Sequence, residues 1–285
     1  MAPAAPAIID YATSDLPLLE RMAAEAGADP GLRDLHAAAL CSRDRFTRTP
    51  LHSLASAAGD NSPAEARQRA RRIRILLDLG ADPALRCSRS RTAVLLASEY
   101  DQPALLEAMA DTPAYFARLR AIAPLRSINR ETALYVAALK GNLRCVEVLC
   151  RCIEADLEDA DALARPALVE EARATHRTLR GWTPVHAAAV HGSIDCVQRL
   201  IRTGVFLVDD QSVHNETALH VAAYTGHRDL VAALLALGAN PRCKTKQQQT
   251  AVHLAQRRHN LEIQALIRNF ASSPGLAGAD PAALA

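Results

Sequence analysis

The sequence predicts an all-α solenoid built from stacked helix–turn–helix repeats. A short Thr-Pro/Ala-Leu/Val-His string returns along the 285 residues, aromatic residues make up only 4% of the chain, and Ala and Leu are abundant. Helices packed closely through small residues fit this composition better than sheets rich in Val, Tyr and Phe. The recurrence therefore favours one long repeat array over two ordinary domains.

Each copy of the string begins at a threonine: Thr49, Thr92, Thr132, Thr183, Thr217 and Thr250. Successive threonines are 43, 40, 51, 34 and 33 residues apart. The last two spacings match a 33-residue unit, and the first three exceed it by about 10, 7 and 18 residues, which surface loops accommodate at small cost. We expect six recognisable repeats, with residues 15–30 as the second half of a diverged N-terminal capping repeat.

The residues of the string predict a short helix with defined ends. Thr suits an N-cap because its hydroxyl can accept a hydrogen bond from an unpaired backbone N–H. Pro or Ala follows, and Pro fits because the first helical amide needs no acceptor. Pairs of small residues such as Ala188-Ala189 let neighbouring helices approach closely. Glycines such as Gly141, Gly192 and Gly226 then predict a left-handed cap that ends the helix.

A second, longer helix is expected in each unit. Its core position lies thirteen residues after the threonine and is apolar in five repeats: Leu105, Cys145, Cys196, Leu230 and Ile263. Three Gly-Ala-Asp/Asn-Pro strings, beginning at Gly27, Gly80 and Gly238, predict where second helices end. Gly takes the left-handed conformation at such an end, and Pro prevents the helix from continuing.

These residues closely resemble the ankyrin repeat family. The unit from Glu216 to Pro241 reads ETALHVAAYTGHRDLVAALLALGANP and follows the family pattern along its length. The resemblance covers residues 15–270, between flexible segments at 1–14 and 271–285. It implies an ankyrin-repeat solenoid with projecting hairpin loops and a concave face that binds a partner. The unit at Thr92 departs from the pattern, with Leu95 in place of His and Asp101-Gln102 where Gly is expected.

Two charged insertions interrupt the repeats, near 59–72 and 152–177. The first contributes to a run of five arginines within residues 67–74, which is either a solvated helix face or a docking strip for anions or import factors. The second is acidic, with Leu157, Leu163, Leu168 and Val169 as a possible apolar stripe interrupted at Pro166. We expect it to form an extra helix or helix pair against the solenoid.

Overall charge and cysteine content suggest an intracellular, cytoplasmic or nuclear protein. The formal net charge is only +2, so bulk charge predicts no nucleic-acid partner. The seven cysteines follow no secretory signal, which favours reduced thiols. No apolar run is long enough to predict a membrane span.

No catalytic, cofactor or metal site is expected. Cys145, Cys150 and Cys152 lie close in sequence, but they form no Cys-x-x-Cys pair, and Cys145 falls in the core register. The histidines at 52, 186, 220 and 253 share one repeat position, and the resemblance implies that they hydrogen-bond around the hairpins. No phosphate-binding loop, zinc-protease motif or nucleophile elbow occurs.

The resemblance also implies which residues contact a partner. In the family, contacts come mainly from hairpin residues before the threonine and from the two residues after the small pair. Carried over, this predicts a binding set: Arg89, Arg91, Tyr100, Glu131, Lys140, Arg180, Trp182, His191, His214, Glu216, Tyr224, Lys246, Arg257 and Arg258. The wider surface from which this set is drawn also includes Arg45, Phe46, Arg48, Glu99, Asn129, Leu139, Leu179, Val190, Thr225, Gln247 and Gln249.

This wider surface holds nine basic and three acidic residues, so it is more basic than the whole chain. We therefore expect a monomer that binds another protein, through an acidic segment with apolar anchors. Trp182, the only tryptophan, is either a binding hot spot or a packing residue against the adjacent hairpin. The alternative function is binding of nucleic acid or another anionic surface through the basic groove and the arginine run 67–74.

Overall fold

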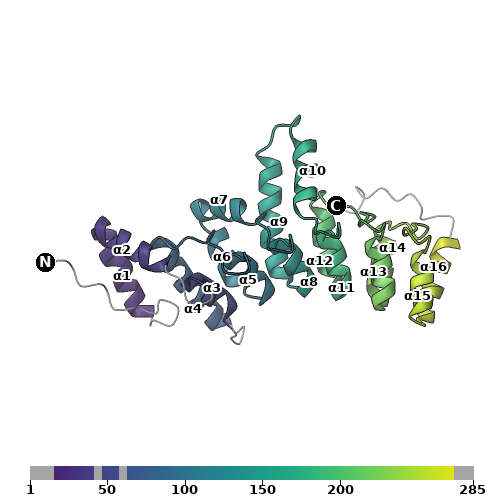
Figure 1. Cartoon of the computed structure of the whole chain (residues 1–285), viewed down its shortest axis with the longest axis horizontal. Coiled ribbons are helices and arrows are strands. Elements are labelled where there is room, and N and C mark those ends of the chain that lie inside the picture. The colour runs from purple at the N-terminus through teal and green to yellow at the C-terminus, as the bar shows by residue number, and fades with distance from the viewer. Residues whose placement is uncertain (1–15, 42–46, 58–62, 273–285) are drawn as a thin grey trace. The chain divides into compact units, whose positions relative to one another are not determined.

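The computed structural model describes residues 16–41, 47–57 and 63–272. These residues form sixteen helices and no strand (Figure 1). The chain divides into two compact units, with the boundary between residues 128 and 129. The first unit contains α1 (Leu16–Ala28), α2 (Pro30–Leu40), α3 (Pro50–Ser56), α4 (Pro63–Asp78), α5 (Ala93–Glu99), α6 (Pro103–Ala110) and α7 (Pro113–Ile122). The second contains α8 (Ala133–Lys140), α9 (Leu143–Glu158), α10 (Arg165–Thr175), α11 (Pro184–His191), α12 (Ile194–Arg202), α13 (Ala218–Thr225), α14 (Arg228–Ala236), α15 (Ala251–Arg257) and α16 (Leu261–Ser272).

A short helix follows each of the six threonines, as predicted. Each threonine has extended backbone, and the helix begins at the next residue. The hydroxyls of Thr92 and Thr132 accept the expected hydrogen bond from the N–H three residues later, at 3.3 Å in both cases. In the other four repeats the threonine and the histidine three residues later form a capping box, in which the hydroxyl also pairs with the imidazole. The threonine cap is therefore confirmed.

The ends of the short helices are set by one backbone position, nine residues after the threonine. Gly141, Gly192 and Gly226 have φ values of 73°, 88° and 91° there, which confirms the predicted left-handed caps. The same conformation is retained without glycine at Asp101 and His259, with φ values of 52° and 56°. The repeat architecture thus keeps the left-handed turn where glycine is missing, at two residue types that adopt it more readily than most others.

The predicted core register is confirmed. All five residues that lie thirteen positions after a threonine are 0–1% exposed, in α6, α9, α12, α14 and α16. The alanine pairs of α8, α11 and α13 are 0% exposed, so these helices pack through their smallest residues. Within the second unit, α8 contacts α11, α11 contacts α13 and α13 contacts α15. This order places the hairpins before α11, α13 and α15 side by side.

The helix pair α15–α16 has a polar outer face. Gln256 is exposed where the equivalent Ala189 and Ala223 are fully buried, and Arg268 is exposed where Leu235 is buried. Polar residues on the outer face are typical of repeats that end a stack.

One of the three Gly-Ala-Asp/Asn-Pro predictions was wrong. Gly80 and Gly238 end second helices with φ values of 95° and 88°, as expected. Gly27 instead lies inside α1, and Asp29 begins a new helix, its carboxylate accepting the N–H of Gly31 at 2.9 Å. Asp-Pro can start a helix as well as follow one, because Asp is a good N-cap and Pro a good first residue.

The described parts of the insertions are largely helical, and residues 59–62 of the first insertion lie outside the described residues. The arginine run lies within α4, and the extra residues of the Thr92 unit form α7, which packs against α6. The acidic insertion lengthens α9 to 16 residues and adds α10, and Figure 1 shows the two helices rising beyond α12 and α14. The expected helix pair is therefore present. The expected apolar stripe is only partial. Leu157, Leu168 and Val169 are half-buried, but Leu163 is 96% exposed, and Pro166 lies in the first turn of α10 and does not interrupt a helix.

The expected flexible N-terminal segment, 1–14, lies outside the described residues. So does the expected tail, except for its first two residues, which belong to α16.

Candidate functional site

Hydrogen bonds of the repeated histidine connect each short helix to the hairpin of the next repeat. In the repeat of His186, Nδ1 accepts from the N–H and hydroxyl of Thr183 at 3.3 and 2.9 Å. Its Nε2 donates to the carbonyl of Glu216 in the next hairpin at 2.8 Å. The same donation reaches Arg91 from His52 at 3.1 Å and Gln249 from His220 at 3.2 Å. The histidines therefore join consecutive repeats, which confirms their architectural role.

Burial and bonding favour the neutral imidazole at His186 and His220. Burial lowers the pKa of His186 and of His220, and the acceptor carbonyls only partly oppose it. A proton could add only at Nδ1, which already faces two donors. Both nitrogens of His220 are thus occupied, so it is poorly suited to act as a general base.

Backbone hydrogen bonds tie the hairpins into a ladder. In the hairpin 178–182 the N–H of Thr178 donates to Trp182 O at 3.0 Å, and Gly181 N–H donates back to Thr178 O at 2.9 Å. Val213 N–H then donates to Arg180 O, and Lys246 N–H to His214 O, both at 3.0 Å. Three consecutive hairpins consequently form one wall beside α11, α13 and α15.

Every described hairpin requires one left-handed residue at its tip, two positions before the threonine. The φ values lie between 53° and 71° for Thr47, Ser90, Arg130, Gly181, Asn215 and Gln248. Only Gly181 is free of the steric cost of this conformation. At that position a Cβ would also lie 2.9 Å from the Val213 nitrogen, so glycine allows the close approach of two hairpins.

Between this hairpin wall and the short helices lies a groove of about 570 Å³. Its lining comes from the same repeat positions in three successive repeats: Trp182, Val190, His214, Glu216, His220, Val221, Tyr224, Thr225, Thr245, Lys246, Gln247, Gln249, Leu254 and Arg257. Val221 and Leu254 occupy equivalent positions on α13 and α15, four residues after their threonines. The groove therefore has an apolar floor with polar groups at its margins, as ligand-binding grooves commonly have.

The comparisons with known proteins identify the repeats. A family model described as "Ankyrin repeat" matches residues 129–162, and one described as "Ankyrin repeats (3 copies)" matches residues 158–245. The chain contains ankyrin repeats. The matched segments include the repeats of Thr132, Thr183 and Thr217, and thus most of the groove.

Several curated proteins are similar to part of this chain. Human "Ankyrin repeat and SOCS box protein 2" is 30% identical over 93 residues, which are 32% of this chain and 15% of that protein. Human "Ankyrin repeat and SOCS box protein 3" is 38% identical over 73 residues, 25% of this chain and 14% of that protein. The mouse "B-cell lymphoma 3 protein homolog" is 33% identical over 114 residues, 39% of this chain and 25% of that protein. The matches thus cover a quarter or less of these relatives, and what they establish is an ankyrin-repeat interaction module.

We call the 570 Å³ groove described above the ankyrin groove. Six of the fourteen predicted site residues line it: Trp182, His214, Glu216, Tyr224, Lys246 and Arg257. Trp182 is half-buried, stacks on His186 with ring centroids 6.0 Å apart, and donates its indole N–H to Glu216 at 3.4 Å. The packing interpretation of this tryptophan is confirmed, because it contacts the adjacent hairpin; it also lines the groove, and the hot-spot interpretation stays a prediction. Tyr224 is 43% exposed and carries the guanidinium of Arg258 over its ring, 4.6 Å from the centroid.

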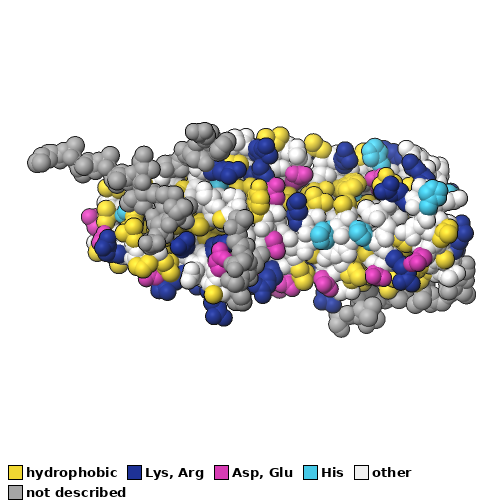
Figure 2. Space-filling model, turned by 90° about the horizontal axis from the view of Figure 1, so that it is seen from below, with side chains coloured by type: hydrophobic (Ala, Val, Ile, Leu, Met, Phe, Trp, Pro, Cys, Tyr) yellow, Lys and Arg dark blue, Asp and Glu magenta, His cyan; other side chains and the backbone are white. Residues whose placement is uncertain are grey.

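The structure shows which predicted charges are already engaged by the chain itself. Arg91 forms an ion pair with Glu99, and Arg258 also donates to the carbonyl of Tyr224 at 3.2 Å. Lys246 and Arg257 form no ion pair with any residue of the described chain. The sequence count of nine basic residues consequently overstates the charge that the surface offers to a partner. In the part of Figure 2 that corresponds to α11–α16, basic, acidic and histidine side chains are interspersed with hydrophobic ones.

The other predicted residues do not line this groove. Arg89, Arg91 and Tyr100 belong to the first unit, where Arg89 and Tyr100 are exposed. In the second unit, Lys140, Arg180 and His191 are exposed and Glu131 is half-buried. The His191 ring lies so close to Gly141 that a Cβ there would approach it within 2.3 Å. Of the wider surface, Arg45 and Phe46 lie outside the described residues.

Four lining residues were absent from the predicted surface: His220, Val221, Thr245 and Leu254. The recurring position four residues after the threonine could have indicated Val221 and Leu254, since it faces the groove side of each short helix.

The arginine run is largely neutralised. Arg69 pairs with Glu65 at 3.0 Å, Arg71 with Glu20 at 2.7 Å, and Arg74 with Asp111. Ion pairs of this kind leave few positive groups for an anionic partner, and Arg69 is itself only 8% exposed. The structure thus favours the solvated-helix interpretation of this run over the docking strip.

The cysteines are packing residues. Cys145, Cys150, Cys152 and Cys196 are buried, and burial raises the pKa of Cys150 to about 12. Among residues 16–41, 47–57 and 63–272, no three His, Cys, Asp or Glu side chains are grouped closely enough to hold a metal ion. Across the same ranges, no helix combines the length and the apolar character needed to cross a membrane.

Proposed function

We propose that the ankyrin groove holds a segment of another protein that carries an apolar anchor next to one or more carboxylates. The observation that supports this most directly is the combination of an apolar floor with two cations that have no ion-pair partner among the described residues. Val221 and Leu254 form the floor, and Lys246 and Arg257 stand at its margin. Apolar burial would supply affinity, and the cations would select the sign of the partner's charge.

Glu216 does not cancel this preference. Its Oε2 already accepts hydrogen bonds from the Trp182 indole and the Ser212 hydroxyl, both at 3.4 Å. Its charge is therefore partly satisfied within the chain. Lys246 and Arg257 form no ion pair among the described residues, and Arg257 donates only one long hydrogen bond, from Nη1 to Oε1 of Gln249 at 3.5 Å. An acidic segment lying across the 245–249 hairpin and α15 would meet the two cations first.

Trp182 and Tyr224 are the aromatic residues of the groove and the best candidates for hot spots. Both are partly exposed, and both are fixed by the chain itself, Trp182 by Glu216 and Tyr224 by Arg258. Preformed aromatic side chains lose little rotamer freedom on binding. The chain would act as an adaptor, scaffold or stoichiometric inhibitor, and binding of this kind requires no catalysis and no cofactor.

A displayed library of random linear peptides, selected on the intact chain, tests the proposal. The expected winners combine Asp or Glu with a neighbouring Leu, Phe or Ile. A double variant, Lys246→Glu with Arg257→Glu, should lose them, with affinity lower by about 30-fold or more if the charges act as hot spots of about 2 kcal/mol.

The matched control is Arg202→Glu with Arg242→Glu. It makes the same change in net charge at two exposed residues outside the groove lining. Winners without acidic residues, or equal losses in the control and in the groove variant, would rule the proposal out.

A further inference from the structure

The acidic insertion supplies a side chain that one repeat lacks. In the repeat of Thr132, Tyr135 occupies the position where four other repeats carry histidine. The Thr132 hydroxyl instead lies 2.8 Å from Nδ1 of His176, the residue that caps α10 and lies 44 positions further along the chain. In the four repeats that have their own histidine, the same distance is 2.8, 2.9, 2.9 and 2.7 Å.

The directions of the hydrogen bonds match as well. The N–H of Tyr135 donates to Oγ1 of Thr132 at 3.3 Å, so the hydroxyl proton is left to donate to His176 Nδ1. Thr132 is 0% exposed and His176 is 5% exposed, so the bond is shielded from water. The other side of the imidazole packs edge-on against Phe206, with centroids 5.9 Å apart. His176 therefore bridges Thr132 and the turn that follows α12.

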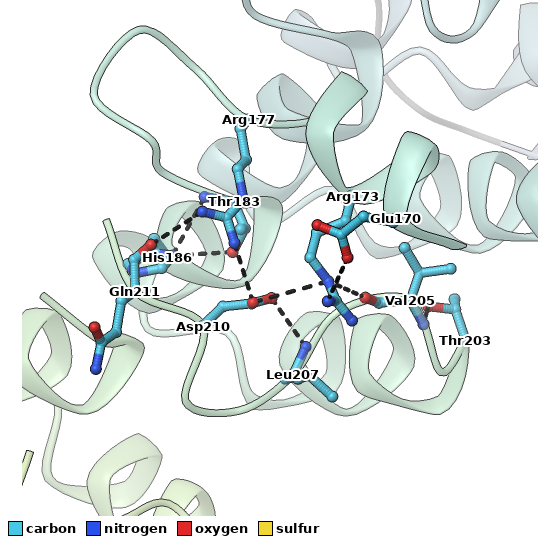
Figure 3. A network of polar contacts seen from close by, with 10 residues as sticks. All are labelled: Glu170, Arg173, Arg177, Thr183, His186, Thr203, Val205, Leu207, Asp210 and Gln211. Atoms are coloured by element: carbon cyan, nitrogen blue, oxygen red, sulfur yellow. Dashed lines mark hydrogen bonds and ion pairs between the residues drawn. The ribbon is translucent and has the colours of Figure 1, made fainter. Parts of the chain in front are cut away.

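Two arginines just before and after His176 attach α10 to the same turn (Figure 3). Arg173 donates from Nε to the carbonyl of Val205 at 2.9 Å. Arg177 donates to the carboxylate of Asp210 at 3.3 Å and to the carbonyl of Gln211 at 3.2 Å. Asp210 is only 7% exposed, and its second oxygen accepts the N–H of Leu207 at 3.0 Å.

Helix α10 is consequently held mainly by directed polar contacts, since none of its own residues is fully buried and Leu168 and Val169 are only half-buried. Hydrogen bonds of this kind fix an orientation, whereas a buried apolar face would tolerate sliding. At the base of the projecting pair, Arg199 of α12 forms a two-point ion pair with Glu154 of α9 at 2.6 and 2.8 Å. Both helices of the insertion are thus fastened to the Thr183 repeat.

We propose that α10 is a clasp that locks the repeat of Thr132 to the repeat of Thr183, with His176 in place of the histidine that Tyr135 displaces. The clasp leads directly into the groove, because the hairpin 178–182 begins two residues after His176 and ends at Trp182. Attachment of α10 by these contacts therefore fixes the position of the hairpin 178–182, the first hairpin of the groove wall. Release of α10 removes the imidazole from Thr132 and both arginines from the turn at Asp210.

A double-mutant cycle tests the substitution of one histidine for another. His176→Ala should lower the thermal midpoint of the second unit by about 2–4 °C and speed amide exchange in both α10 and the first turn of α8. Tyr135→His should then restore most of the midpoint in the His176→Ala background. In two later repeats the carbonyl of the residue just before the threonine, Glu216 or Gln249, accepts a hairpin N–H and also the Nε2–H of the histidine in the preceding repeat. The equivalent carbonyl of Trp182 accepts the hairpin N–H of Thr178. A histidine at position 135 would supply the second donor to this carbonyl.

Glu171→Gln is the matched control, because this exposed side chain of α10 makes none of the clasp contacts. It should leave the midpoint unchanged. If His176→Ala does not fold, His176→Leu, which keeps more of the side-chain volume but offers no acceptor to the Thr132 hydroxyl, takes its place in the same cycle. The clasp is overturned if loss of His176 leaves the midpoint and the exchange of α8 unchanged. It is also overturned if the double variant is as unstable as the single one, since His176 would then be an ordinary packing residue.

Discussion

Acidification should destabilise the second unit well above the pH at which carboxylates titrate. Burial lowers the pKa of His186 and His220 below the usual 6.5. The unfolded chain therefore takes up protons at a pH where the folded chain does not. The contribution of each histidine is complete above about pH 6.5 and is lost as pH falls from there toward its folded-state pKa.

The size of the effect follows from proton linkage. Each histidine that is neutral when folded and protonated when unfolded adds about 1.4 kcal/mol per pH unit to the slope of stability against pH. Two such residues give a slope of at most about 2.7 kcal/mol per pH unit below pH 6.5. Urea unfolding followed by circular dichroism, in steps from about pH 7.5 to about pH 5.5, measures this slope above the carboxylate range.

His186→Leu is the matched variant, because Leu95 occupies the same repeat position in the Thr92 unit and is only 2% exposed there. Leucine therefore fits the site and cannot titrate. The variant should be less stable at neutral pH, and its slope should be shallower by about 1.4 kcal/mol per pH unit. A stability that stays constant from neutral pH to about 5.5, or an equal slope in the variant, would refute the assigned bonding of the ring.

Three further predictions concern packing and backbone. Gln248→Gly should raise stability by about 0.5–1 kcal/mol, because Gln248 has a φ of 58°. Gly181→Ala should lower stability by more than this, because alanine is strained at that φ and its Cβ would clash with the next hairpin. Thermal unfolding of both variants checks the two signs. Leu230→Ala should cost about 2–5 kcal/mol in urea unfolding, whereas Leu261→Ala, at a residue 75% exposed, should stay within about 0.5 kcal/mol. Iodoacetamide at mildly alkaline pH should modify the half-exposed cysteines well before Cys150, and rapid labelling of Cys150 by mass spectrometry would contradict its raised pKa.

The sequence predicted the features that depend on one repeat position at a time. The threonine cap, the glycine end and the apolar position of the second helix recur in register, so each copy supports the others. The Gly-Ala-Asp/Asn-Pro strings at Gly80 and Gly238 end second helices as predicted, and a hairpin follows each of them. In the string that begins at Gly27, the glycine lies inside α1 and the aspartate caps α2. A local pattern cannot distinguish the two cases when the next element is not known.

Features that depend on distant residues could not be predicted from the pattern. The carboxylates that neutralise Arg71 and Arg74 come from α1 and from the end of α6. The imidazole that serves Thr132 comes from an insertion that looked only acidic. Asp101 and His259 also keep the left-handed conformation that glycine adopts in other repeats, and the missing glycine gave no sign of this turn in the sequence pattern.

Within the predicted site, sequence register placed six residues correctly in one groove but could not show which charges the chain itself uses. Arg257 and Arg258 are adjacent in the sequence, yet Arg257 lines the groove whereas the guanidinium of Arg258 lies over the ring of Tyr224.

Amide hydrogen exchange of the intact chain, with and without an acidic peptide chosen by the selection described above, tests the central claim most directly. Protection should appear in the hairpins 212–216 and 245–249 and in α13 and α15, and should vanish in the Lys246→Glu, Arg257→Glu variant. Protection confined to α4 or to the α9–α10 pair, with the groove unchanged, would contradict the account.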